Sequence, residues 1–147
     1  MDATQGFLRY MVATIAYRGS KVINGAPEGF GETRTCAGAM SAIEIVAHMC
    51  DALEWAARLA SGQSDWKPQP PGAWNSEIER FHYALKRLDA CFAADTPACE
   101  PKRLIHGPLA DVLTHIGQIA LLRRCAGSPI PGVNYFKAEI SVGDVPA

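Results

Sequence analysis

Gly107-Pro108-Leu109-Ala110-Asp111-Val112-Leu113-Thr114-His115-Ile116-Gly117-Gln118 is the stretch of sequence from which the fold is best predicted. Proline is well accepted at the first position of a helix, so we expect a long helix to begin at about Pro108. Gly127, followed closely by Pro129, predicts the end of this helix in a left-handed cap. The spacing of apolar residues between these limits indicates a helix that lies largely inside the protein.

Two ionisable side chains interrupt the apolar centre of this helix. Asp111 and His115 stand one turn apart, and Gln118 follows on the same face at i+7. Burying a carboxylate and an imidazole costs several kcal/mol unless the groups are paired, hydrogen-bonded or bound to a metal. Asp111 and His115 are therefore the first candidates for a functional role.

Three further amphipathic segments, with no convincing strand, predict an all-α fold. The expected helices run from about Ala3 to about Val22, from Met40 or Ser41 to about Ala60, and from a cap at Asn75 to a stop at Thr96-Pro97. Four long helices favour a four-helix bundle that occupies residues 1–147 as a single domain. The long connection between the first and second helices leaves the order of the helices open.

The tail after Gly127 is rich in proline and glycine yet carries large apolar side chains. We expect it to pack on one end of the bundle, with one short element near Tyr135 to Ile140.

The composition argues against several classes of protein. Lys and Arg number 14 against 15 Asp and Glu, with no basic run, so we expect no nucleic-acid partner. The N-terminus lacks the features of a signal peptide and no apolar run is long enough to cross a bilayer, which predicts a soluble, cytoplasmic protein. The five cysteines form no Cys-x-x-Cys pair, so we expect reduced thiols. Serine-hydrolase and nucleotide-binding glycine patterns are absent from the sequence.

The expected second helix carries a polar stripe beside its apolar face, formed by Glu44, His48, Asp51 and Trp55. Functional sites in helical bundles are built from side chains that project inward from facing helices. If the second and last helices are neighbours, His48 approaches the acidic and imidazole side chains of the last helix.

His48, Asp111 and His115 would then supply two imidazoles and one carboxylate. This donor set is typical of a catalytic divalent-metal site of the zinc or non-haem iron kind. Glu44, Asp51 and Gln118 are candidates for a fourth ligand or for partners that orient the imidazoles.

An interpretation without a metal is also open. One buried histidine paired with one aspartate across a helix interface satisfies both groups, and His48 with Asp111, or His115 with Asp51, would be enough. The protein would then be a non-catalytic, dimeric helical module. A carrier that binds a small ligand with its tryptophans is a third possibility.

Two motifs resemble the DinB/YfiT-like metalloenzyme superfamily: Ile45-Val46-Ala47-His48-Met49-Cys50-Asp51-Ala52-Leu53-Glu54-Trp55, and Thr114-His115-Ile116-Gly117-Gln118. The resemblance extends over most of the chain, including the tail Gly127-Ser128-Pro129-Ile130-Pro131-Gly132. It implies a four-helix bundle, frequently dimeric, in which one histidine of the second helix and two histidines of the last helix hold a metal.

His48 and His115 match two of the ligands of this family. The third position holds Asp111, where the family usually has histidine, and a carboxylate there favours harder, oxygen-rich coordination.

The resemblance also implies an activity. Similar proteins include thiol S-transferases that use low-molecular-weight thiols, and a thiol-dependent isomerase. We therefore expect a metal-dependent transferase or hydrolase that acts on a small electrophilic substrate, with zinc, nickel or iron as the metal and a low-molecular-weight thiol as co-substrate. The family implies a homodimer, with His48, Asp111 and His115 as ligands and Glu44, Asp51, Gln118 and Trp55 as supporting or substrate-facing residues.

Overall fold

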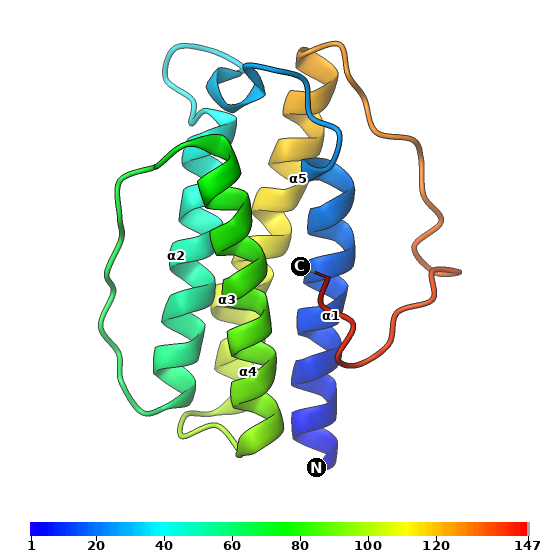
Figure 1. Ribbon diagram of the computed structural model, residues 1–147. Helices are drawn as coiled ribbons and strands as arrows, with labels where there is room; N and C mark the ends of the chain where they lie inside the picture. The colour runs from blue at the N-terminus through cyan, green and yellow to red at the C-terminus, as the bar shows by residue number, and fades with distance from the viewer. Residues whose placement is uncertain (147) are drawn as a thin grey trace.

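Four long helices lie side by side in the computed structural model, which describes residues 1–146 (Figure 1). They are α1 (Ala3–Ile23), α2 (Ala42–Ala60), α3 (Trp74–Ala94) and α5 (Ala110–Cys125). Three short helical segments lie between them: η1 (Phe30–Glu32), α4 (Pro101–Leu104) and η2 (Ile105–Leu109). The described residues contain no strand, which confirms the predicted all-α bundle.

The helices are ordered up, down, down, up, because α2 and α3 run in the same direction (Figure 1). Two contacts agree with this parallel course. Cys50, midway along α2, meets Glu77 near the start of α3, and Ala60 at the end of α2 meets Ala98 just beyond the end of α3. The crossover is therefore the connection between α2 and α3, residues 61–73, and this settles the helix order that the sequence left open.

Proline content explains why residues 61–73 can make this crossover. Lys67-Pro68-Gln69-Pro70-Pro71-Gly72 cannot be helical and remains extended. The whole connection of thirteen residues, 61–73, can span about 40 Å when extended. This exceeds the length of about 28 Å that α2 has with its 19 residues.

Capping residues fix the ends of several helices. Asp2 and Gln5 form a capping box at the start of α1, and Ser41 and Glu44 form a second one at the start of α2. Gly127, with a φ of 73°, follows the end of α5 in the left-handed conformation expected of it. The start of α3 differs from the prediction, because its N-cap is Ala73 and the expected cap Asn75 lies inside the first turn.

The last helix begins earlier than its sequence predicts. Pro101 occupies the start of α4, and the helical path continues through the π-helical segment η2 into α5. Gly107 departs from helical geometry with φ −90° and ψ −109°, and Pro108 has no N–H to donate to the carbonyl four residues earlier. At Pro108 the helical path is therefore kinked, whereas the sequence predicts the first turn of a helix there. Proline occurs both in first turns and at kinks, so the sequence does not distinguish the two.

The core lies where the four helices meet, and α2 packs against both α3 and α5. Its largest fully buried side chains include Phe81, Phe92, Met49, Leu8 and Ile119. The contact between α2 and α5 places His48 opposite Asp111, which is the feature of the fold that matters for the site.

Arg123 joins three segments at one end of the bundle. Its guanidinium is buried and donates to the carbonyl oxygens of Val22, Asn24 and Gly25 at the end of α1, and to Ser128 in the tail. The tail itself forms turns without helix or strand through residue 146, so the short element expected near Tyr135 to Ile140 is not formed. The prolines of the tail cannot donate main-chain hydrogen bonds, and the main-chain bonds near Tyr135 close only turns, from Lys137 to Asn134 and from Ala138 to Tyr135.

Candidate metal centre

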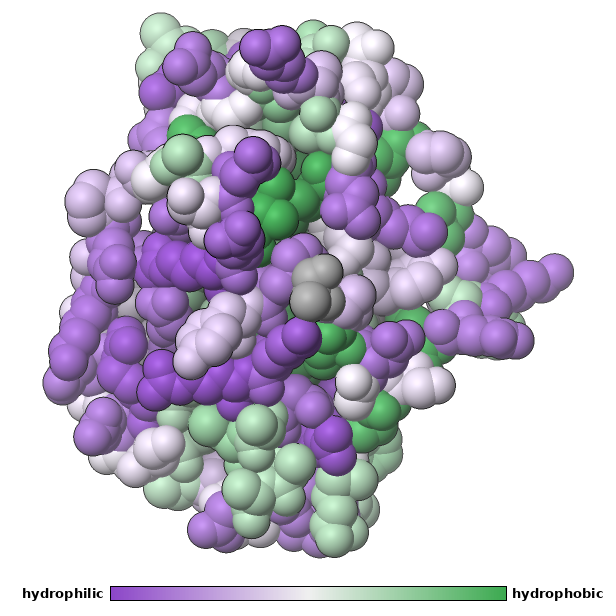
Figure 2. Space-filling view, viewed as in Figure 1, coloured by the Kyte–Doolittle hydropathy of each residue, from purple (hydrophilic) through white to green (hydrophobic). Residues whose placement is uncertain are grey.

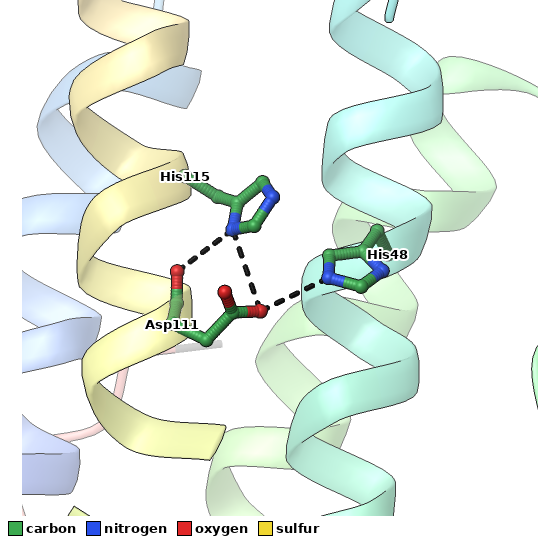
Figure 3. A group of neighbouring side chains, drawn as sticks. All are labelled: His48, Asp111 and His115. Carbon is green, nitrogen blue, oxygen red and sulfur yellow. Dashed lines mark hydrogen bonds and ion pairs between the residues drawn. The ribbon is translucent and has the colours of Figure 1, made fainter. Parts of the chain in front are cut away.

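His48 of α2 and the pair Asp111 and His115 of α5 point toward one another across the interface between these helices (Figure 3). His48 donates from Nε2 to Oδ2 of Asp111 over 3.0 Å. The ring centres of His48 and His115 are 4.6 Å apart. One possible ligand atom from each residue lies within 4.8 Å of the other two. The structure thus brings together the three side chains that the sequence suggested.

Hydrogen bonding determines which nitrogen of His115 carries its proton. Nδ1 lies 2.7 Å from the main-chain carbonyl oxygen of Asp111, and a carbonyl oxygen can only accept. Nδ1 therefore holds the proton in the neutral ring, which leaves the lone pair on Nε2. Metal-binding histidines commonly donate their other N–H to a carbonyl in this way, because the bond fixes both the tautomer and the ring orientation.

The site is partly open to solvent. The side chains of His48, Asp111 and His115 retain 31%, 45% and 13% of their exposure. Beside them lies a cavity of about 600 Å³, whose lining includes Trp55, Trp66, His106 and Thr114. His48 and Asp111 line this cavity, so a small molecule can reach them without unfolding either helix.

Aromatic side chains form one wall of this cavity. The ring of Trp66 meets His48 edge to face, with 5.9 Å between centres, and also packs against Trp55 at 5.5 Å. Trp55 was expected to face the substrate, and it does line the cavity. Trp66 and His106 were not among the site residues expected from the sequence. Trp66 lies in a proline-rich connection without periodicity, whereas the position of His106 next to the Gly107-Pro108 break was a usable signal.

Asp51 lies outside the group of three and faces α3. It is 4% exposed and accepts from Nη2 of Arg80 over 2.6 Å and from the main-chain N–H of Gln69. Three residues along a helix turn a side chain by about 60° from the starting direction, which is enough to point Asp51 away from α5. The alternative pairing of His115 with Asp51 is therefore not formed.

Glu44 and Gln118 also lie outside the group of three. Glu44 caps α2 through Ser41 and pairs with Arg34 over 2.8 Å. The hydrogen bonds from Ser41, with the nearby Arg34, hold the pKa of Glu44 below its usual range. Gln118 is exposed on α5.

The donor set fits a divalent cation. Two imidazoles and one carboxylate suit zinc, nickel or iron and leave coordination positions for other ligands. The carboxylate supplies negative charge, and the carbonyl of Asp111 orients His115.

Comparison of the chain with models of known protein families, with curated proteins and with solved structures finds no match. Among residues 1–146, no helix combines the length and the apolar character that a membrane span requires.

Proposed function

We propose that the protein is a metal-dependent enzyme of the DinB/YfiT-like type, in which His48, Asp111 and His115 hold a divalent metal. The observation that carries this proposal is the convergence of their three ligand atoms within 4.8 Å, beside a cavity that solvent can enter. Purely structural pairs have no need of such a cavity. The sequence resemblance of the second and last helices supports the same assignment.

The chemistry proposed is transfer or hydrolysis at a small electrophilic substrate. Once bound, a divalent metal lowers the pKa of a bound thiol or water and so supplies a nucleophile near neutral pH. The rings of Trp55 and Trp66 would hold the apolar part of the substrate and exclude water. His106 and Thr114 offer hydrogen-bonding groups on the same cavity wall.

Cys50, the one buried cysteine among the described residues, is a poor source of the thiol. Burial raises the pKa of Cys50 far above its usual range, so this thiol stays protonated and unreactive. Cys50 also donates to the carbonyl oxygen of Glu77 in the core. In this proposal a thiol-dependent reaction would use a low-molecular-weight thiol as a co-substrate, as the sequence resemblance implies.

A second candidate function is favoured by one observation. The hydrogen bond from His48 to Asp111, together with the bond from His115 to the carbonyl of Asp111, already gives each of these residues a partner without a metal. In that case the group stabilises the α2–α5 interface of a non-catalytic helical module.

Elemental analysis of protein purified without a tag or chelator separates these functions, combined with a His115→Ala variant. The metal-dependent enzyme should contain about one metal per chain, and His115→Ala should lose it with little loss of fold, measured by circular dichroism. The non-catalytic module should contain background metal only, and His115→Ala should lower its stability by about 1 kcal/mol because a hydrogen bond is lost. His82→Ala, on α3 and away from the site, is the matched control for metal content.

A further inference from the structure

A second cavity, of about 1030 Å³, lies between α1, α5 and the tail. None of its lining residues belongs to the cavity beside His48. Residues from the segments 101–105 and 130–135 also line it. The tail leaves the end of α5 and passes along the outer side of α1 (Figure 1). We call this cavity the α1–α5 groove.

The walls of the α1–α5 groove are mainly apolar. Phe7 and Met11 of α1 face it, as do Leu113 and Ile116 of α5. Phe7 is 74% exposed, which is an unusually large apolar exposure for so bulky a side chain. Figure 2 shows strongly apolar residues at the surface over α1, between polar ones. A Cβ added at Gly117, on the floor of the groove, would meet no atom within 4 Å, so the space there is free.

All the charged side chains that line the groove are basic. Arg18, Lys102 and Arg124 line it, and no Asp or Glu does so among the described residues. Lys102 is paired with Glu100 over 3.0 Å. In residues 1–146, neither Arg18 nor Arg124 has a carboxylate within ion-pair distance; the guanidinium of Arg18 instead lies 3.8 Å from the ring centre of Tyr135.

Arg18 and Arg124 lie at the same end of the groove. The neighbour of Arg124, Arg123, donates to the carbonyl of Val22, which is one turn beyond Arg18 on α1. The apolar body of the groove extends away from this end, because Phe7 precedes Arg18 on α1 by a distance of about 16 Å. A molecule in the groove would therefore have its anionic group beside two arginines and its apolar part along the two helices.

We propose that the α1–α5 groove binds an elongated aliphatic carboxylate, with the carboxylate at Arg18 and Arg124. Arginine binds carboxylates through parallel N–H···O bonds, and small-molecule sites are typically apolar clefts with a few directed polar groups. The arrangement selects against cations and against molecules without charge. The proposal stands apart from the metal centre, since the two sites share no lining residue.

Calorimetric titration of the full chain with dodecanoate, kept below its micelle concentration, tests the proposal. We expect saturable one-to-one binding, at least tenfold weaker binding of dodecanol, and no binding of dodecyltrimethylammonium. Arg18→Gln and Arg124→Gln should each weaken dodecanoate binding by about tenfold. Arg87→Gln, which removes an exposed cation on α3, should leave the affinity unchanged.

Gly117→Leu tests the location, because its side chain would occupy the free space on the floor of the groove. This variant should lose dodecanoate binding while its circular dichroism and melting temperature are retained, and Ala90→Leu on the exposed face of α3 is the control. Equal affinity for dodecanoate and dodecanol, or unchanged affinity in both arginine variants, would overturn the proposal. So would a dimeric wild-type protein that Gly117→Leu converts to a monomer, because the groove would then be an interface between two copies. His115→Ala should bind dodecanoate like the wild type, so failure of the metal proposal leaves this test intact.

Discussion

His115 donates from Nδ1 to the main-chain carbonyl oxygen of Asp111 over 2.7 Å, so the backbone of one candidate ligand orients the ring of the other. Both residues lie on α5, one turn apart. This main-chain carbonyl is present whichever side chain residue 111 carries, and Oδ2 of Asp111 adds a longer contact of 3.5 Å to Nδ1 of His115. This separates two roles of that position: its carbonyl positions His115, and its carboxylate lies 3.0 Å from Nε2 of His48.

Asp111→Asn should weaken divalent-metal binding at least tenfold without disturbing the helix, because it removes the charge and keeps the shape of the side chain. Asp111→His should shift the preference toward zinc and nickel over manganese, since an imidazole replaces a harder oxygen ligand. Competition titrations with a chromogenic chelator measure both affinities. Equal affinity of Asp111→Asn and the wild type would mean that this carboxylate does not bind the metal.

Arg80→Met should destabilise the fold by about 3 kcal/mol, because carboxylates at the α2–α3 interface would lose the cation that compensates them. Arg80 donates to Asp51, Glu54 and Glu77, and its bonds to Glu54 and Asp51 raise its pKa well above the usual range. Asp51 and Glu77 are buried. Urea unfolding measures the effect, with Arg87→Met as the exposed control. If Arg80→Met lost no more stability than Arg87→Met, the carboxylates at the α2–α3 interface would not depend on the charge of Arg80, because solvent would already compensate them.

His82 should make the fold less stable in mild acid. Burial, with a smaller effect of Lys86, lowers the pKa of His82, and its Nδ1 is buried without a partner among the described residues. As the pH falls, the imidazole of His82 therefore becomes protonated in the unfolded chain at about pH 6.5, and in the folded chain only at a lower pH. The contribution of His82 to the free energy of unfolding is therefore fully present above about pH 6.5 and is lost as the pH falls below that value.

His82→Gln should reduce this loss, measured as the difference in urea midpoint between about pH 7.5 and about pH 5.5. His106→Gln, at an exposed position, controls for removal of a histidine. An identical pH dependence in His82→Gln and the wild type would contradict the assignment.

Two glycine substitutions should have opposite effects. A Cβ at Gly19 would lie 2.7 Å from Cζ of Phe81, so Gly19→Ala should cost about 1 to 3 kcal/mol through overpacking. Gly117 meets nothing within 4 Å, so Gly117→Ala should stabilise α5 by about 0.5 to 1 kcal/mol. Thermal melts of both variants provide the comparison. A neutral Gly19→Ala would indicate that the ring of Phe81 moves without cost.

Local patterns in the sequence were enough to place most helices. The capping boxes at Asp2 and Ser41 and the cap at Gly127 act within a few residues, so they are visible without a structure. The spacing of Asp111 and His115 likewise places them on one face of a helix whatever surrounds it. The start of that helix was predicted less well, because a proline suits both a first turn and a kink.

The sequence by itself thus determined the all-α class, the helix positions and the shared face of Asp111 and His115, because each depends on interactions between residues close in the chain. Only the tertiary structure decided that α2 lies against α5 with His48 beside Asp111, and that Asp51 binds Arg80 instead. It also decided that the crossover is residues 61–73. Proline excludes a helix there but does not set the direction of the next one, which follows from the packing of apolar faces distant in sequence.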